Sequence, residues 1–407
     1  GALFVACERS HVITTRQYSC LSVKLATKFN TGTGRSPDGV WKVLLPNDAV
    51  LFLVDNTLNA LQAFVSFYRK RYHFPVIGIT GSNGKTIVKE WLNQLLSPFY
   101  NIIKNPKSYN SQVGVPLSVV AINEEHNLGI FEAGISQPNE MIRLQGIIQP
   151  TIGVLTNIGS AHNEGFSSKE EKLQEKLLLF KDAEVLISEK TDLINQYKPT
   201  NVSWFNWSFT KDSDVVFTKN DHELVVSYAG QQFYISLPFS DLASVENICT
   251  CVTTLLYLKI DVDYVQQAVS KLHAVQMRLQ VKKGANDCLI IDDSYSSDYQ
   301  SLKIALDFLE QQKTHSQKTV ILSDIFQSGF TPEVLYDKVG QLLNQNHVTR
   351  VIGIGSKITA YLTNVHQFQS YPDTETFLND FNLKSFRNET LLIKGSRSFE
   401  FEKIVAE

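Results

Sequence analysis

The chain has 407 residues and a formal charge of −3, from 38 basic and 41 acidic side chains. This near-neutral balance excludes a chain-wide basic surface for nucleic acid or anionic membrane, so any phosphate binding must be local. Hydrophobic residues make up 43% of the chain and charged residues 19%, as in globular proteins of two or three domains. Five irregularly spaced cysteines match neither a disulfide framework nor a zinc motif, and no apolar run approaches the roughly 18 residues that span a bilayer. We therefore expect a reduced, cytoplasmic protein.

The first 73 residues have a mixed texture. A Gly/Ser/Pro-rich stretch covers 31–39, a strand is predicted at 48–54, and an amphipathic helix at about 58–71. The opening letters GALFVA are typical of the middle of a strand. We expect 1–73 to be an incomplete N-terminal domain.

From residue 74 onward, short β-branched runs alternate with helical patterns. This alternation predicts βαβ units around a mostly parallel sheet. The predicted strands lie at 76–80, 129–134, 151–158 and 184–188. An aromatic stretch with turn residues at 202–237 predicts β-hairpins appended to that sheet, followed by helices at 242–257 and 262–273. Together these elements predict a central α/β domain over 74–274.

A second alternating series begins near Gln280. Its predicted strands, each followed by a helical segment, lie at 288–292, 319–324, 350–355 and 389–395. This pattern predicts a second α/β domain over 275–407.

The sharpest local motif is VIGITGSNGKT at 76–86, an apolar strand that leads through a glycine-rich turn into a helical pattern. Backbone amides of such a loop and the helix N-terminus bind phosphate oxygens. The strict G-x-x-x-x-G-K-T motif fails at Ile79, but G-x-x-G-K-T remains. The candidate nucleotide-binding residues are Gly81, Ser82, Asn83, Gly84, Lys85 and Thr86. The alternative is a glycine turn followed by an exposed lysine.

Two more polar side chains follow predicted strands, at the sheet edge where ligands bind in open parallel sheets. Glu132 closes an apolar strand within the segment IFEAG, and His162 lies in LTNIGSAHNE. Each could be a Mg²⁺ ligand. Alone, a glutamate at a strand end is more often a helix cap or a surface charge, and a loop histidine is more often structural.

Several segments together resemble the Mur ligase family of ATP-dependent amide-forming enzymes. The likeness covers about 74–407 and rests on TGSNGKT, FEAG, TNIGSAH, YNSQVGVPL, MRL, IDDSY and IKGSR. It implies a multidomain α/β fold with a P-loop central parallel-sheet domain, a Rossmann-like C-terminal domain and a partial N-terminal domain that binds the UDP substrate.

The likeness is greatest to one branch of that family, which adds D-alanyl-D-alanine to UDP-N-acetylmuramoyl-tripeptide in peptidoglycan synthesis. The phrases DDSYSSD, SLKIALDFL and LSDIFQSG resemble the ligase half of a Bacteroidetes-type fusion with an alanine racemase. The implied partners are the nucleotide-linked tripeptide and the dipeptide, with a racemase domain in the full-length protein and no nucleic acid.

The resemblance also implies a carbamate. In this branch a lysine that reacts with CO₂ follows the loop histidine by fourteen residues, and the residue fourteen after His162 is Lys176. A carbamate is the oxygen-donor anion that Mg²⁺ prefers. Lys169 and Lys172 are rival lysines on the same predicted helix, 169–180, and a solvated lysine is the alternative reading.

The family then implies ATP and two Mg²⁺ sites. Lys85, Thr86 and Glu132 would serve the β/γ-phosphates, His162 and carbamoylated Lys176 would hold a second Mg²⁺, and Arg278 would reach the γ-phosphate when the domains close. Further implied contacts are Asn247 and Asp293 for the nucleotide, and Asn110, Ser111, Lys394, Ser396 and Arg397 for the peptide substrates.

The chain departs from the branch pattern at several places. Residues 294–299 read SYSSDY instead of Y-N-A-N-P after the aspartate, residues 327–329 read QSG instead of E-L-G, and Tyr336 stands where histidine is common. The alternatives are therefore another Mur-type ligase, such as a folylpolyglutamate synthase, or a degenerate nucleotide-binding protein without ligase activity. A structural protein without ATP is least favoured.

Overall fold

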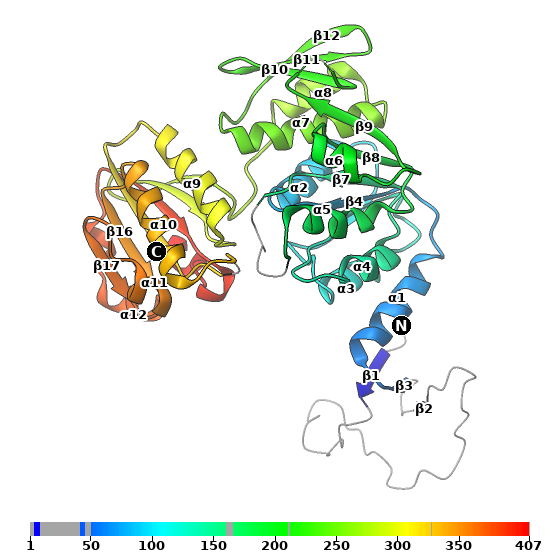
Figure 1. Ribbon diagram of the computed structural model, residues 1–407, viewed down its shortest axis with the longest axis horizontal. Coiled ribbons are helices and arrows are strands. Elements are labelled where there is room, and N and C mark those ends of the chain that lie inside the picture. The colour runs from blue at the N-terminus through cyan, green and yellow to red at the C-terminus, as the bar shows by residue number, and fades with distance from the viewer. Residues whose placement is uncertain are drawn as a thin grey trace.

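The computed structural model describes residues 4–8, 41–44, 50–159, 166–210, 212–326 and 328–406. Figure 1 shows two α/β bodies, a central one and a C-terminal one, with the N-terminal strands beyond α1 (Thr57–Arg69), away from the central sheet. Within these described ranges, each helix is too short or too polar to cross a membrane.

The N-terminal part contains one small sheet. Its strands, in the order β1-β3-β2, are β1 (Phe4–Glu8), β2 (Trp41–Leu44) and β3 (Val50–Val54). The predicted amphipathic helix is α1 (Thr57–Arg69), and it begins where the Asn56 side chain accepts a 2.8 Å hydrogen bond from the amide of Asn59. Such an N-cap satisfies an amide that has no partner within the helix.

The central sheet has nine strands in the order β12-β11-β10-β9-β8-β7-β4-β6-β5. Their bounds are β4 (Val76–Thr80), β5 (Ile102–Lys104), β6 (Leu128–Glu132), β7 (Ile152–Leu155), β8 (Val185–Glu189), β9 (Ser203–Ser208), β10 (Val215–Lys219), β11 (Glu223–Tyr228) and β12 (Gln231–Ser236). The strands from β5 to β10 pair in parallel. The prediction of hairpins over 202–237 is wrong for β9, which continues the parallel sheet, and is confirmed for the antiparallel β10, β11 and β12.

Helices cover both faces of the central sheet (Figure 1). They are α2 (Lys85–Leu96), α3 (Gly114–Val119), α4 (Met141–Ile148), α5 (Lys169–Leu177), α6 (Asp192–Tyr197), α7 (Leu242–Tyr257) and α8 (Val262–Val269). Alternate residues of β4 enter opposite cores: Ile77 and Ile79 pack with α2, α7 and α8, whereas Val76 packs with α1, α3, α4 and α5. Burial on both faces explains why β4 reads as an unbroken apolar run.

The C-terminal sheet has six strands in the order β13-β14-β18-β15-β16-β17. Their bounds are β13 (Gln280–Lys283), β14 (Leu289–Asp293), β15 (Gln317–Ser323), β16 (Arg350–Ile354), β17 (Phe368–Tyr371) and β18 (Glu389–Lys394). Helices α9 (Tyr299–Gln311), α10 (Pro332–Gln345), α11 (Ser356–Tyr361), α12 (Thr374–Asp380) and α13 (Glu402–Ala406) belong to this part. All pairs except β13–β14 are parallel, which confirms the predicted second α/β unit.

The connectivity places several loops at the carboxyl ends of parallel strands. In the central sheet β4 lies between β7 and β6, and in the C-terminal sheet β18 lies between β14 and β15. Loops at such ends form the ligand sites of open α/β sheets. The loops after β4, β6 and β14 are therefore the first places to look for a site.

Candidate nucleotide and acyl-transfer site

The loop between β4 and α2 requires glycine at two positions. Gly81 has φ 150° and Gly84 has φ 80°. A Cβ on Gly81 would lie 2.0 Å from Thr156 Oγ1, and a Cβ on Gly84 would lie 2.3 Å from Asn247 Oδ1. Side chains are therefore excluded both by backbone conformation and by neighbouring atoms.

The loop is anchored to the segment after β7. The amides of Ser82 and Asn83 donate to the Asn157 carbonyl at 2.9 Å and to Asn157 Oδ1 at 3.0 Å, and Thr156 Oγ1 donates to the Asn83 carbonyl at 2.6 Å. Gly84 begins α2 without a side-chain cap. The first amides of α2 are thus left for a ligand, and the helix dipole favours an anion there.

Lys85 lies against this loop. Its Nζ donates to the carbonyls of Gly81 and Ser82, each at 2.8 Å. Burial lowers the pKa of Lys85 to about 8, because desolvation and the positive charge of Arg278 outweigh the attraction of Glu132 and Asp298. The alternative, a glycine turn followed by an exposed lysine, does not describe this side chain.

Glu132 ends β6 with its carboxylate fully buried, and neither oxygen has a hydrogen-bond partner among the described residues. Burying an unpaired carboxylate is costly, so a cation ligand is the natural partner. Thr86 at the start of α2 shares a hydroxyl hydrogen bond of 2.9 Å with Ser108 in the loop after β5. The orphaned carboxylate and a helix-start hydroxyl fit Mg²⁺, which takes few protein ligands when phosphates supply the others.

Lys176 and its neighbour Lys172 point from α5 towards two loops, the one after β4 and the one after β7. The buried Lys176 Nζ donates to the Gly81 carbonyl at 3.0 Å, and the buried Lys172 Nζ donates to the Gly159 carbonyl. Burial together with Lys85 and Lys172 holds the pKa of Lys176 well below its usual range. Lys169 is exposed at the helix start.

Leu173 and Leu177 of α5, and Phe180 just after it, are buried. His162 lies outside the described residues. Within the described ranges no three His, Cys, Asp or Glu side chains gather as a metal site. The second predicted Mg²⁺ site, on His162 and carbamoylated Lys176, therefore stays a prediction.

Two adjoining cavities open beside the loop. The smaller, about 280 Å³, is lined by Lys85, Thr86, Asn110 and Asp298, and the larger, about 570 Å³, by Asn157, Glu246 and Gln300 among others. Residues common to both are Asn83, Gly84, Ile87, Arg278 and Ser296. The two cavities therefore adjoin, and both meet the phosphate loop.

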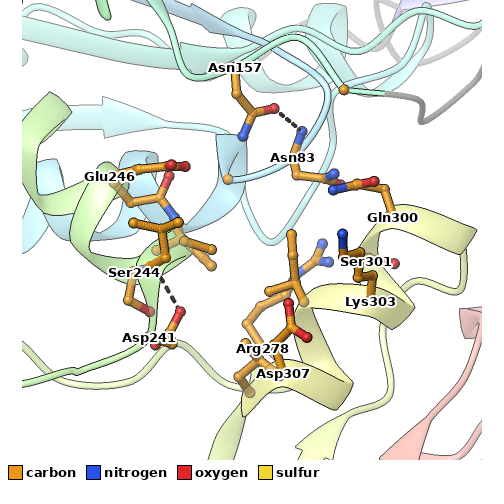
Figure 2. A pocket seen from close by; sticks show the side chains of 18 of the residues that line it. Asn83, Asn157, Asp241, Ser244, Glu246, Arg278, Gln300, Ser301, Lys303 and Asp307 are labelled. Atoms are coloured by element: carbon orange, nitrogen blue, oxygen red, sulfur yellow. Dashed lines mark hydrogen bonds between the residues drawn. The ribbon is translucent and has the colours of Figure 1, made fainter. Parts of the chain in front are cut away.

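Figure 2 shows the larger cavity between the two bodies. Asn83 and Asn157 face Gln300 and Lys303 of α9, with Glu246 of α7 on the other side. Elements of the central and the C-terminal sheets thus meet across the space. A nucleotide with its phosphates at the loop would contact both bodies.

Arg278 lines both cavities. Its Nη1 donates to Ser296 Oγ at 2.8 Å, and its Cζ lies 4.4 Å from the centre of the Tyr295 ring. The flanking Met277 and Leu279 have φ of 59° and 50°, a left-handed conformation that side-chain-bearing residues rarely adopt. We expected Arg278 to reach the phosphates only after closure, but here it already shares a cavity with Lys85.

The larger cavity also contains acidic groups that the sequence did not single out. Burial raises the pKa of Glu246 to about 7, helped by Glu189 and Asp241. Asn247, which was predicted, is buried and contacts Gly84. Glu189 is far from Glu246 in sequence, so no local pattern could have indicated this cluster.

The predicted nucleotide contact Asp293 lines the larger cavity but is paired. Its Oδ2 lies 2.7 Å from the buried Lys394 Nζ, which also donates to the Ser296 carbonyl. Lys394 therefore holds the loop after β14 instead of facing an open cleft. Ser396 and Arg397 follow at the end of β18, where the Ser396 amide donates to Ser323 Oγ at 2.9 Å and Arg397 is exposed.

The two residues after β5 that were predicted to contact the peptide substrates lie in different surroundings. Asn110 lines the smaller cavity, and its carbonyl accepts a 2.8 Å bond from the Gly134 amide. Ser111 is exposed, and its Oγ accepts a 3.1 Å bond from the Gly114 amide at the start of α3. The structure thus brings Asn110, but not Ser111, into the lining of the phosphate cavity.

The fold and the cavity define an α/β protein with a P-loop-like turn and a second α/β body that lines the same cavity. The model of the Mur ligase middle domain matches residues 79–255. The chain is 25% identical over 376 residues to the UDP-N-acetylmuramoyl-tripeptide--D-alanyl-D-alanine ligase of Bacillus subtilis, covering 89% of this chain and 82% of the relative. It is 28% identical to the ligase of the same name from Buchnera aphidicola of Acyrthosiphon pisum, covering 87% and 81%.

Solved structures agree in fold. MurF from Acinetobacter baumannii matches with a TM-score of 0.76 at 21% identity, covering 89% of this chain and 82% of that one. MurF from Thermotoga maritima in complex with ADP matches with a TM-score of 0.74 at 21% identity, covering 88% and 84%. Residues 79–255 thus resemble the Mur ligase middle domain in sequence, and most of the chain has the fold of these ligases.

Proposed function

We propose that this chain is an ATP-dependent, ADP-forming ligase that joins D-alanyl-D-alanine to UDP-N-acetylmuramoyl-tripeptide in peptidoglycan synthesis. The curated relatives with that name span most of the chain. The structural observation that supports the proposal best is the cavity in which the phosphate loop, Lys85 and Arg278 meet, together with the unpaired carboxylate of Glu132, whose charge acts on Lys85. These are the groups that phosphoryl transfer needs, since it depends on positioning and charge neutralisation.

The chemistry has two steps. The terminal carboxylate of the tripeptide attacks the γ-phosphorus of ATP, which releases ADP and leaves an acyl phosphate. The dipeptide amine then attacks the acyl carbon, loses a proton and expels inorganic phosphate. Lys85, the amides of α2 and Arg278 would stabilise the charge on the transferring group, and their preorganised positions lower the barrier.

Mg²⁺ would be held by Glu132 and Thr86 and would neutralise charge on the nucleotide phosphates. The two residues fit this role because the Glu132 oxygens are buried and unpaired and the Thr86 hydroxyl lies at the start of α2. Nucleotide substrates of this kind are made in the cytoplasm, where we place the enzyme. The sequence likeness to the fused branch further predicts an alanine racemase domain in the full-length protein.

Ligase activity is tested by phosphate release from ATP with UDP-N-acetylmuramoyl-tripeptide, with and without D-alanyl-D-alanine, and by the mass of the product. We expect product and phosphate release only with both peptides. Nucleotide binding without phosphate release would support the degenerate binder. Activity with a pteroate and glutamate instead would support the folylpolyglutamate synthase alternative.

We also propose the carbamate at Lys176, since its buried Nζ faces the phosphate loop. Carbon-13 NMR of the protein under labelled CO₂ should give one carbamate signal that Lys176→Ala removes. Acetate should restore part of the lost activity by supplying the missing oxygen donor. Lys172→Ala is the matched control, because Lys172 is buried on the same helix; a signal lost in that variant alone would assign the carbamate to Lys172 instead.

A further inference from the structure

The loop between β14 and α9 is held at several points. Ser294 Oγ donates to Asp292 Oδ1 at 2.6 Å, and Lys394 Nζ donates to the Ser296 carbonyl. Asp298 and Ser301 form a reciprocal capping box that starts α9. Because each end is fixed to the sheet or to the helix, the side chain in the middle of the loop has a defined place.

That side chain is Tyr295, and two arginines contact it. The Arg278 Cζ lies 4.4 Å from the ring centre and the Arg397 Cζ lies 5.5 Å from it. The Arg397 amide also donates to the Tyr295 carbonyl at 3.2 Å. One ring thus contacts an arginine from the segment that joins the two bodies and an arginine from the end of β18.

The contact matters because an arginine is flexible and Arg278 has few other restraints. Among the described residues its guanidinium makes one hydrogen bond, to Ser296 Oγ at 2.8 Å. An aromatic face attracts a guanidinium and fixes its plane, which lowers the entropy lost when the side chain binds an anion. Tyr295 and Arg278 line the same small cavity as Lys85.

We propose that Tyr295 is a positioning residue that holds the Arg278 guanidinium against the phosphate cavity and ties it, through the same ring, to Arg397. This role extends the proposed function. Its second part, the tie to Arg397 as a contact of the peptide substrate, rests on that function. The aromatic ring of Tyr295, and not its phenol hydroxyl, holds the guanidinium. Tyr295 contacts no reacting atom and acts through Arg278.

The test compares affinities for two nucleotides by calorimetry with Mg²⁺: a non-hydrolysable ATP analogue and ADP. Arg278 should favour the extra phosphate of the ATP analogue. We expect Tyr295→Leu to reduce that preference by about 3- to 30-fold, the range of a cation–aromatic contact. Tyr295→Phe should keep it, since the ring remains.

Two further variants separate positioning from a general loss of structure. Tyr299→Leu removes a ring only a few residues away that packs on Phe330 and should leave the preference unchanged. In an Arg278→Ala background, Tyr295→Leu should have no further effect, because the ring acts through the arginine. An unchanged preference in Tyr295→Leu, or additive losses in the double variant, would overturn the proposal.

These binding measurements do not require ligation. If the wild-type chain released no phosphate from ATP with both peptides, the proposed function would fail while the Tyr295 result stood. If the wild-type chain is active, Tyr295→Leu should also raise the KM for the tripeptide more than Tyr295→Phe does. Equal KM values for the two variants would remove the link through Arg397.

Discussion

Lys85 is the first residue of α2, and its ammonium group donates to two carbonyls of the phosphate loop. Lys85→Ala should lower turnover by about 100-fold or more, because it removes a preorganised charge from the transferring phosphate. Circular dichroism should show that the fold is retained. Lys190→Ala, which removes a surface pair with Asp212, is the control and should keep full turnover. Near wild-type turnover in Lys85→Ala would refute the phosphate-loop assignment.

At the residue scale, the sequence predicted the strand-end and loop residues but not their partners. Gly81, Gly84 and Lys85 follow from the local pattern, since strand, glycine turn and helix are consecutive. The contact of Tyr295 with Arg397 depends on tertiary structure, because β14 and β18 become neighbours only in the sheet. For the same reason the burial of Lys394 beneath the loop could not be predicted.

The left-handed backbone conformation of Met277 and Leu279 could not be predicted from the sequence either, because neither residue type favours positive φ. Such strain persists only where surrounding structure fixes it, and it is common near functional sites. Here the two residues bracket Arg278, so the strain lies where the chain passes from one body to the other.

At the scale of elements, the contact between Gly84, just before α2, and Asn247 of α7 leads to a direct prediction. Gly84→Ala should destabilise the protein by about 1–3 kcal/mol, because φ is 80° and the new Cβ would lie 2.3 Å from Asn247 Oδ1. Adding Asn247→Ala should recover the part caused by the clash but not the part caused by φ. Thermal denaturation measures both.

The matched control is Gly146 of α4, where a Cβ would meet nothing within 4 Å. Gly146→Ala should stabilise the protein by about 0.5–1 kcal/mol, since glycine is a poor residue inside a helix. A loss of stability there equal to that of Gly84→Ala would contradict the steric argument.

Helix α7 also predicts a pH dependence. The pKa of Glu246 is raised to about 7, so the folded state binds its proton more tightly than the unfolded state does. Between the ordinary glutamate pKa and about 7, the stability contributed by Glu246 therefore falls as pH rises, and above about 7 the cost is complete. Glu246→Gln should raise the free energy of unfolding more at pH 8 than at pH 5, by about 1 kcal/mol after allowing for solvent screening, and the melting temperature should rise accordingly.

The control for this measurement is Glu223→Gln, because Glu223 is exposed on β11. It should change the melting temperature equally at both pH values. A Glu246→Gln protein with the same pH dependence as wild type would contradict the raised pKa.

At the scale of the whole molecule, the nucleotide cavity belongs to two bodies at once. A Mg²⁺–nucleotide complex should therefore stabilise both, by about 2.7 kcal/mol at a hundredfold excess over Kd. Calorimetric unfolding should show both transitions moving upward, and proteolysis between the bodies near Arg278 should slow. In Arg278→Ala, the nucleotide should no longer shift the unfolding transition of the C-terminal body. If the nucleotide shifted only the central transition in the wild type, the central body would bind it by itself.

The overall architecture was predictable because parallel strands buried on both faces give continuous apolar runs separated by helical patterns. Strands β4, β14 and β16 appear close to their predicted positions. The short strands β5 and β17 were missed, since three or four residues carry too little pattern. The parallel pairing of β9 was missed because its aromatic sequence resembles that of the antiparallel strands after it.

Strand β12 ends the nine-stranded sheet, so its outer backbone groups lie at an edge that another unfolded chain could join. Helix α8 packs along β12, and its Gln266 side chain donates to the Tyr234 carbonyl at 2.9 Å. Part of the edge is thereby occupied by the protein itself. Loosening of α8 would uncover an extended strand with exposed Tyr234, and self-association through β12 is then the route by which a weakened form of this protein would aggregate.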